Sequence, residues 1–331
     1  MTRPTSIVTG ASGQDGYLLT RRLLDLGGGV HAVVRNRAAV ADLPRTRDEA
    51  KRLTVHVMDI LDAASLAALV DRVQPDEIYN LAGQSSVSAS FVDPDTTWRT
   101  NVEPVLAFLE AMRTRSPASR LYQSSSSEMF GSIPGGEVVH DERSPLAPQS
   151  PYAAAKAAAH LACAAYRSAY GLRVACGILF NHESRRRSGA FLSRKVVDYV
   201  GGILLVARQI EVRASVLDRP AEPDIGASYR DYVLGTGTLT AVWELVDRAF
   251  HHGGFALRWS RESNDPAEWR AWFEDTGELA VVVDSTYLRP ADPAAIQADP
   301  SLARRELGWS PHVGLEPFLA EMLDQSAASS R

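Results

Sequence analysis

Residues 6–16 read Ser6-Ile7-Val8-Thr9-Gly10-Ala11-Ser12-Gly13-Gln14-Asp15-Gly16, and this stretch decides the fold. Its first four residues form a short, largely β-branched run that predicts a strand, and the periodic residues Tyr17 to Leu26 predict a helix. Glycines spaced G-x-x-G-x-x-G permit a tight turn, close approach to a pyrophosphate and close packing of the helix on the strand. The first N–H groups of the helix face the phosphates. The stretch therefore predicts dinucleotide binding at Gly10, Ser12, Gly13, Gln14, Asp15 and Gly16.

The rest of the chain continues the alternation of strands and helices. Further apolar strands are expected near Val30, Val55, Ile78, Leu121 and Val174. Strands that alternate with helical stretches predict an α/β fold, here a Rossmann-type doubly wound parallel sheet with right-handed crossovers. The alternation ends after Phe180. We expect a dinucleotide-binding domain over residues 1–180, whose sheet and helices later segments could complete, and a smaller C-terminal domain, mainly for substrate, over residues 181–331.

The end of the second predicted strand discriminates between NAD and NADP. An NAD site places an acidic residue there for the ribose 2′-hydroxyl, whereas this chain has Arg35-Asn36-Arg37. Two guanidiniums suit a 2′-phosphate, so Arg35 and Arg37 predict NADP. A solvated basic loop is the alternative. Later strand ends supply further predicted cofactor contacts at Asp59, Ile60, Leu81 and Ala82.

Four side chains follow in an order suited to oxidation of a sugar alcohol and elimination of water from the ketone. Tyr152 and Lys156 are four residues apart in a helix entered through Pro151, so they project from one face. A lysine ammonium favours the phenolate and lowers the tyrosine pKa from about 10, which lets Tyr152 take a proton from a substrate hydroxyl. Ser126, at a strand end, can orient that hydroxyl. Glu128 adds a base that simple dehydrogenases do not need.

Composition excludes several other classes of protein. The formal net charge of −5 leaves no basic surface for nucleic acid, and no uninterrupted apolar stretch has membrane length. The two cysteines, Cys163 and Cys176, lie in apolar runs without ligand-like spacing. We expect them to be buried, reduced thiols in a cytoplasmic protein, with no metal site.

These motifs together resemble one known group of enzymes. The chain resembles extended short-chain dehydrogenase/reductases, in which the G-x-x-G-x-x-G spacing accompanies Tyr-x-x-x-Lys, and is most similar to GDP-mannose 4,6-dehydratases. The run Asn181-His182-Glu183-Ser184 is the most family-specific part. The other segments that carry the resemblance are residues 9–16, 75–85, 122–128, 150–152, 177–180, 287–290 and 307–309.

The resemblance implies a lyase that uses NADP and a nucleotide-sugar substrate. Tyr152 would remove the C4 hydroxyl proton as hydride passes to NADP, Glu128 would then remove the C5 proton, and water would leave from C6. Ser126 stands where the family usually has threonine, and it keeps the hydroxyl.

The resemblance also implies roles for residues that no spacing argument reaches. Tyr152, Lys156, Gln84, Leu179 and His182 would contact the cofactor. The implied substrate-binding residues are Ser85, Ser127, Asn181, Glu183, Lys195 and Arg289.

The chain departs from the family between Gly202 and Gly235. The family has there an Arg-Asp-Trp element that touches the nucleotide pyrophosphate, and in this chain the stretch is shortened. Residues 230–232, Arg-Asp-Tyr, could be the remnant of that element. Residues 231–234 could instead form the strand that leads into Gly235. The shortening concerns the identity of the substrate more than the cofactor.

Three functions stay open from the sequence. The first is a GDP-hexose 4,6-dehydratase acting on GDP-mannose or a related sugar, the second another nucleotide-sugar enzyme such as an epimerase or 5,6-dehydratase, and the third a non-catalytic NADP-binding protein. In the resembling family two long helices, here Thr96–Arg113 and Tyr152–Tyr170, pack against their copies. We therefore expect a homodimer, with a homotetramer formed through the Arg35 loop as the alternative; the other reading is that these are core helices.

Overall fold

The structure is a computed structural model that describes residues 3–44, 52–132, 138–184, 186–189, 191–207, 229–263, 265–283, 295–311 and 313–329. The chain forms two compact units. Unit 1 comprises Met1–Asn181, Ile225–Gly237 and Pro293–Leu307, and unit 2 comprises His182–Asp224, Thr238–Asp292 and Gly308–Arg331. The chain thus leaves unit 1 and returns to it. The predicted division of cofactor and substrate binding at residues 180 and 181 stays a prediction.

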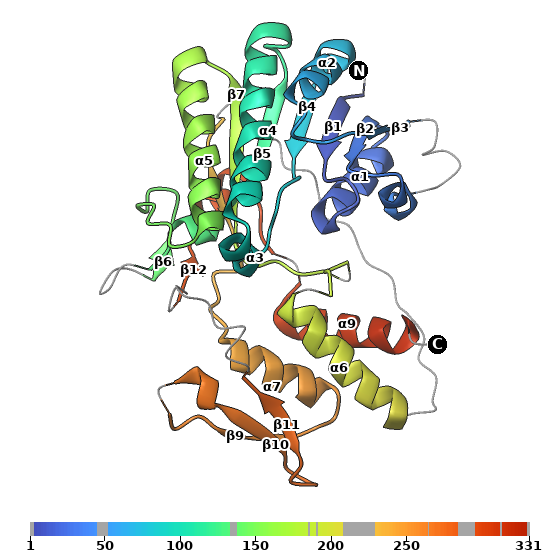
Figure 1. Cartoon of the computed structure of the whole chain (residues 1–331), viewed down its shortest axis with the longest axis vertical. Coiled ribbons are helices and arrows are strands. Elements are labelled where there is room, and N and C mark those ends of the chain that lie inside the picture. Colours follow the sequence, from blue (N-terminus) through green and yellow to red (C-terminus); the bar gives the residue numbers. More distant parts are fainter. Residues whose placement is uncertain are drawn as a thin grey trace. The chain divides into compact units, whose positions relative to one another are not determined.

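Unit 1 is built on a parallel sheet of seven strands, which confirms the predicted Rossmann-type fold (Figure 1). The strand order is β3-β2-β1-β4-β5-β7-β8, and each neighbouring pair is parallel. The order reverses between β1 and β4. The strands are β1 (Thr5–Thr9), β2 (Gly29–Val34), β3 (Leu53–Val57), β4 (Glu77–Asn80), β5 (Arg120–Ser126), β7 (Arg173–Leu179) and β8 (Tyr232–Leu234).

Alternation along the strands divides the core of unit 1 into two layers. Ile7 and Val8 are consecutive in β1 and fully buried, yet they belong to different clusters because successive side chains point to opposite faces. Ile7 packs with α2 (Ala63–Val73), α4 (Pro94–Arg115) and α5 (Pro151–Tyr170), which lie side by side in Figure 1. Val8 packs with α1 (Gln14–Asp25). Such two-sided burial explains the continuous apolar runs of the sequence.

The edge strand β8 is closed by a side chain. The backbone N–H of Val233 donates to Oε1 of Glu142 at 2.7 Å, and burial raises the pKa of this carboxyl group. Nearby, the short strands β6 (Val139–His140) and β12 (Gln297–Ala298) pair with each other, and α8 (Ser301–Leu307) follows. The smaller elements of unit 1 are α3 (Val87–Val92) and the 3₁₀ turns η1 (Ala38–Asp42) and η3 (Ser127–Met129).

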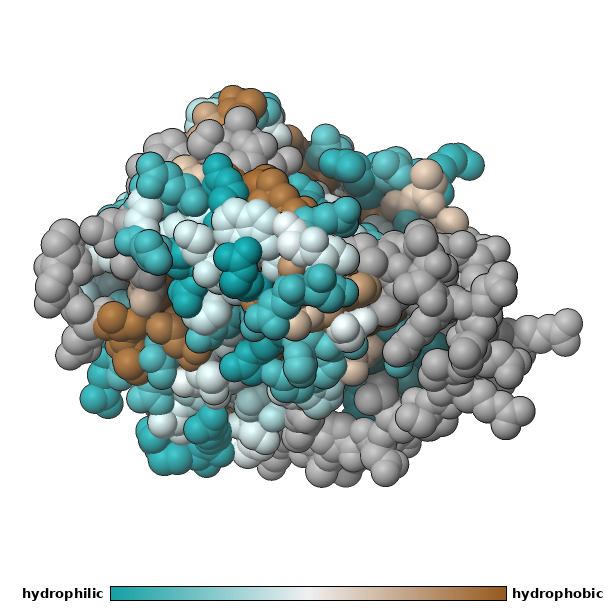
Figure 2. Space-filling model, turned by 90° about the horizontal axis from the view of Figure 1, so that it is seen from below, coloured by the Kyte–Doolittle hydropathy of each residue, from teal (hydrophilic) through white to brown (hydrophobic). Residues whose placement is uncertain are grey.

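Unit 2 combines three helices with an antiparallel sheet in the order β11-β10-β9. Its core contains Val197, Phe250, Leu319 and Met322. The elements are α6 (Leu192–Ala207), α7 (Val242–His252), β9 (Leu257–Ser260), η4 (Pro266–Glu268), β10 (Arg270–Phe273), β11 (Leu279–Val282) and α9 (Leu315–Ser329). Among the described residues, no helix is both long and apolar enough to cross a membrane. Figure 2 shows mostly hydrophilic coloured surface, with small, separate hydrophobic patches.

Candidate active site

The predicted site residues of unit 1 gather at the carboxyl edge of the parallel sheet. Because all seven strands run in the same direction, the residues that follow their carboxyl ends lie along one edge. Gly10 follows β1, Arg35 follows β2, and Leu81 follows β4. The point where the strand order reverses lies between β1 and β4, and in open α/β sheets ligands bind at such a point.

The glycine turn after β1 leaves room where side chains would clash. Gly10 has φ +64, and a Cβ atom there would lie 3.0 Å from the backbone N of Ala82. At Gly16 an added Cβ would lie 2.1 Å from the carbonyl O of Gly10. Gly13 is the N-cap of α1 and supplies no side-chain hydrogen bond to the helix. The turn therefore leaves the open helix start that a dinucleotide pyrophosphate would need, and the predicted contacts at Gly10 to Gly16 stay predictions.

A buried ladder of polar side chains fixes this edge, and the sequence analysis missed it. Thr9 Oγ1 donates to Asn80 Oδ1 at 2.8 Å and accepts from the N–H groups of Leu81 and Ala82 at 3.0 and 3.1 Å. Asn80 Nδ2 donates to Gln123 Oε1 at 2.8 Å. The ladder joins β1, β4 and β5 directly beneath the predicted cofactor turn. Its only sequence signal is a polar residue at each of three strand ends.

Two exposed guanidiniums follow β2. Arg35 and Arg37 are both exposed, and neither forms a salt bridge with any carboxylate among the described residues. Asn36 between them accepts the N–H of Ala39 at 3.0 Å, which shapes the turn. The two charges are therefore available to an anionic ligand at the end of β2.

The predicted pair on α5 is buried and held by its helix. Ser150 caps the helix by accepting the N–H of Ala153 at 3.1 Å, and Pro151 occupies the first turn. Tyr152 and Lys156 are 8 % and 7 % exposed. Lys156 Nζ donates to the carbonyl O of Ser124 at 3.0 Å and lies 5.8 Å from the centre of the Tyr152 ring.

Burial has a marked effect on this lysine. It lowers the pKa of Lys156 to about 8, and the carboxylate of Asp15 acts in the opposite direction. The ammonium group of Lys156 therefore loses its proton more readily than a lysine in water does. A negative charge brought next to it would raise its pKa again.

Ser126 and Glu128 lie next to each other at the end of β5. Ser126 is its last residue, and Glu128 follows in η3. The backbone N–H of Glu128 donates to Ser126 Oγ at 3.3 Å. Met129 and Phe130, almost fully buried, anchor the turn beneath them. The structure thus brings the predicted hydroxyl and carboxylate to one strand end, in the strand against which α5 packs.

The other predicted residues of unit 1 lie along the same edge. Asp59 and Ile60 follow β3, and Asp59 Oδ1 accepts the N–H of Leu61 at 3.0 Å. The amide of Gln84 braces its own loop by donating to Ser86 O at 2.8 Å and Thr97 Oγ1 at 3.2 Å. Ser85 is exposed, Ser127 is buried, Leu179 ends β7 and Asn181 is exposed. Their binding roles stay predictions.

Four predicted ligand-binding residues fall in unit 2, and one of them lies outside the described residues. Glu183 accepts Ser193 Oγ at 2.8 Å and pairs with Arg187 at 3.1 Å. His182 and Lys195 are exposed. Arg289 is the residue outside the described part of the chain.

The structure tests one of the two readings of the stretch around Asp231. Strand β8 begins at the next residue, Tyr232, and pairs with β7, so the reading as a strand leading into Gly235 is confirmed. Arg230 pairs with Glu306 at 3.1 Å. Arg230 thus has a partner within unit 1, and a pyrophosphate-binding role for residues 230–232 stays a prediction.

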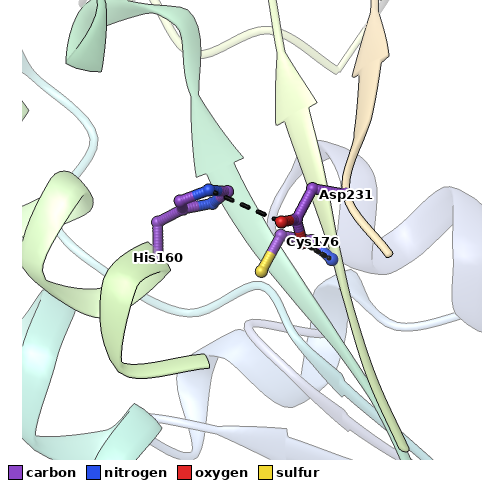
Figure 3. A group of neighbouring side chains, drawn as sticks. All are labelled: His160, Cys176 and Asp231. Carbon is purple, nitrogen blue, oxygen red and sulfur yellow. Dashed lines mark hydrogen bonds and ion pairs between the residues drawn. The ribbon is translucent and has the colours of Figure 1, made fainter. Parts of the chain in front are cut away.

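Asp231 also meets two residues that spacing did not connect to it. His160, Cys176 and Asp231 place one ligand-type atom each within 4.8 Å of one another (Figure 3). The cysteines are buried and free as expected. No sign of the cluster is visible in the sequence, because its three members come from different elements: α5, β7 and the residue before β8.

The fold and the carboxyl-edge residues define an extended short-chain dehydrogenase/reductase. A family model described as GDP-mannose 4,6 dehydratase matches residues 7–214 and 226–322. The chain belongs to the GDP-mannose 4,6-dehydratase family.

Relatives match over almost the whole length. The GDP-mannose 4,6-dehydratase of Vibrio cholerae is 32 % identical over 354 residues, which cover 98 % of this chain and 93 % of the relative. GDP-mannose 4,6 dehydratase 2 of Arabidopsis thaliana is 35 % identical over 348 residues, which cover 98 % and 87 %.

Solved structures share the fold at lower identity. The dTDP-glucose 4,6-dehydratase of Bacillus anthracis, in complex with NAD, has a TM-score of 0.71 at 17 % identity and covers 98 % of this chain and 97 % of its own. RMD from Pseudomonas aeruginosa, complexed with NADPH, has a TM-score of 0.69 at 20 % identity, with coverages of 98 % and 99 %.

Proposed function

We propose that this enzyme removes water from GDP-mannose to give the 4-keto-6-deoxy sugar, with NADP as its cofactor. The observation that carries the proposal is the position of Ser126 and Glu128 at the end of β5, the strand on which the helix with Tyr152 and Lys156 packs. Full-length relatives named GDP-mannose 4,6-dehydratases support the choice of reaction and sugar.

The first step needs a base for the C4 hydroxyl. Tyr152 takes that proton, while Ser126 Oγ donates a hydrogen bond that orients the hydroxyl oxygen. Lys156 favours the phenolate through its charge. A nicotinamide cofactor bound at the glycine turn would supply the hydride chemistry, with hydride taken from C4 and later given back at C6. Because hydride is returned, the reaction has no net redox change.

The second step needs a carboxylate. Oxidation at C4 makes the C5 hydrogen acidic, and Glu128 takes it as a proton and passes that proton to the departing C6 hydroxyl, which leaves as water. The proton that Tyr152 took from the C4 hydroxyl balances the return of hydride to C6 when a proton is delivered to C5, so the net change is loss of one water. Glu128 lies in η3 and Tyr152 lies in α5, so the two proposed bases come from different elements. Separate elements let one group act at C4 and the other at C5 of one bound sugar.

Support for NADP comes from the end of β2. Arg35 and Arg37 are exposed there, and planar guanidiniums recognise phosphate oxygens in pairs. The same sheet edge carries the glycine turn for the pyrophosphate. Replacement of either arginine by glutamine is expected to weaken NADP binding while NAD binding stays unchanged.

We also propose a homodimer that pairs through α4 and α5. The exposed apolar side chains Trp98, Leu106, Leu161 and Tyr170 lie on these two helices. Sedimentation of the protein should give the dimer mass, and Leu161→Glu should give the monomer. The wild type could instead sediment at the tetramer mass. If Arg35→Glu then sediments at the dimer mass, this would support further pairing of dimers through the Arg35 loop.

The test is mass spectrometry of the protein with NADP and a panel of nucleotide hexoses. Loss of one water from GDP-mannose is expected, and Glu128→Gln should reduce bound NADP without releasing the dehydrated product. Tyr152→Phe should do neither. An isomer of unchanged mass would indicate an epimerase, and normal turnover by Glu128→Gln would remove the elimination role from this residue.

A further inference from the structure

His160 continues the line of the predicted catalytic residues on α5. Tyr152, Lys156 and His160 are separated by four residues each, so they occupy successive turns on one face. All three are buried, with exposures of 8 %, 7 % and 9 %. The first two have a role in the proposed reaction, and the mechanism does not use the third.

Successive turns of α5 are fastened to successive residues of β5. Lys156 Nζ donates to the carbonyl O of Ser124 at 3.0 Å, and His160 Nδ1 lies 3.1 Å from Ser125 Oγ in a buried hydrogen bond. The next residue of the strand is Ser126. These contacts therefore set the position of the helix along the strand at the point where the two predicted catalytic elements meet.

The other side of the imidazole faces a fixed carboxylate (Figure 3). His160 Nε2 lies 3.7 Å from Asp231 Oδ2. Arg167, two turns further along α5, donates to both oxygens of Asp231 at 2.8 and 2.7 Å. The backbone N–H of Cys176 adds a third donor at 3.3 Å. The network thus links α5 to β5, β7 and the start of β8.

The charges in this network favour an imidazolium. Burial alone would lower the pKa of His160, but contacts with Cys176 and Asp231 outweigh it and raise the pKa above the ordinary value, with Arg167 opposing them. Contact with Cys163 and burial raise the pKa of the Cys176 thiol well above the usual range. The thiol is therefore uncharged near neutral pH, and the carboxylate of Asp231 is the negative charge that faces His160. Ser125 is the group that faces the imidazole from β5.

The same cluster offers three ligand-type atoms, but its chemistry disfavours a metal ion. Both oxygens of Asp231 are already held by the guanidinium of Arg167. A divalent cation bound to that carboxylate would lie against a second positive charge with little water to screen it. The arrangement instead suits a hydrogen-bonded brace.

We propose that His160 is a positioning residue, which holds the Tyr152 and Lys156 face of α5 in register with Ser126 through its contacts with Ser125 and Asp231. This inference rests on the proposed function for its effect on turnover. A shift of about 1 Å between reacting groups can cost roughly 100-fold in rate.

The first experiment is a double-mutant cycle with His160→Leu and Ser125→Ala. Each variant is expected to lower kcat for GDP-mannose about 10- to 100-fold, with KM changed less than threefold, and the double variant should lose no more than the worse single variant. NADP affinity should weaken in the same non-additive way, because Lys156 is displaced. The control is Tyr166→Phe, also on α5, which loses a 2.6 Å hydrogen bond to Glu110 of α4 and should leave kcat unchanged.

The second experiment follows pH. The imidazole of His160, observed by NMR in the wild-type protein, should titrate above its ordinary pKa of about 6.5. The kcat of the wild type should fall as pH rises through that value, whereas His160→Gln, whose amide can reach Ser125, should recover part of the lost kcat and lack this pH dependence.

Several results would overturn the inference. Additive losses in the cycle, losses in kcat that only follow lowered Tm, or one zinc ion bound per chain and removed by His160→Leu would each do so. A wild type that binds NADP but dehydrates no sugar would refute the proposed function instead. The cycle in NADP affinity and the NMR titration would then still decide the role of His160.

Discussion

The amino ends of α1 and α5 are built in opposite ways, although both lie at the functional edge of unit 1. Helix α5 begins with Ser150, whose hydroxyl accepts the N–H of Ala153, and with Pro151. Helix α1 begins with Gly13, which gives no side-chain cap. An uncapped helix start presents N–H groups to an anion, whereas a capped one fixes the side chains that follow. The start of α1 therefore suits an anionic ligand, and the start of α5 fixes the position of Tyr152.

Among the changes that test this difference between the two helix starts, Gly16→Ala is expected to have the largest effect. The new Cβ would lie 2.1 Å from Gly10 O, so α1 must move away from the turn. Affinity for NADP should fall more than 100-fold, as measured by titration of protein fluorescence. Gly171→Ala at the carboxyl end of α5 is the matched control, since nothing lies within 4 Å there and only its φ of +65 is strained. It should cost about 1 kcal/mol and leave NADP affinity unchanged.

Lys156→Met should separate stability from activity on α5. Turnover should fall at least 100-fold. The free protein should gain roughly 1–3 kcal/mol near pH 7, because a lysine whose pKa burial lowers to about 8 is costly to keep charged.

The direction in which the stability of the wild type changes with pH follows from the protons that Lys156 binds in the folded and unfolded states. Between about pH 8 and 10.5 the unfolded lysine holds a proton that the folded one has lost, so wild-type stability rises across this window. Urea unfolding at pH 7 and pH 10 should therefore show the advantage of the methionine variant shrinking. An advantage that stayed constant with pH would contradict this account of Lys156.

Ser150→Ala should weaken the capped helix start. Loss of the hydrogen bond to Ala153 is expected to cost about 1 kcal/mol in free energy of unfolding. The kcat should fall severalfold, because Tyr152 lies in the first turn, and NADP affinity should hold. Urea unfolding and initial rates measure the two effects. Ser150→Asn, which can restore the cap, should recover both.

Gly13→Ser should give the smallest change and make α1 resemble α5. Gly13 has φ −71 and ψ 176, which a capping serine adopts easily, and its Cβ would lie 3.2 Å from Gly10 O. The free protein should gain a few tenths of a kcal/mol. NADP affinity should drop about tenfold, because the hydroxyl competes for the phosphate-facing N–H groups. Equal or tighter NADP binding would show that the α1 start does not hold phosphate.

The parts of the fold that sequence predicted are those with short-range signals. The strand, glycine turn and helix at Ser6 to Leu26 occupy one continuous stretch, and Tyr152 and Lys156 share a face by helical periodicity alone. These features could be predicted from the spacing of residues along the chain alone. The order of the proposed catalytic residues Ser126, Glu128, Tyr152 and Lys156 could be stated for the same reason.

Contacts between distant segments had no such signal. Asp231 could be read as part of two different elements until its pairing with Arg167, 64 residues earlier, was visible. Asn80 and Gln123 looked like ordinary strand ends, yet they form a buried ladder because β4 and β5 are neighbours in the sheet. Periodicity describes one element at a time, and these partners come from different elements.

The position of β8 has a consequence for how the protein is made. As the chain leaves the ribosome from its amino end, His160 and Arg167 are synthesised well before the aspartate that neutralises them. A nascent Rossmann unit that ends at Asn181 thus carries His160 and Arg167 on α5 without their carboxylate partner, and a β7 edge that is not yet paired with β8. The sheet of unit 1 can therefore be completed, and these two side chains can meet their carboxylate, only after residues 231–234 have been translated.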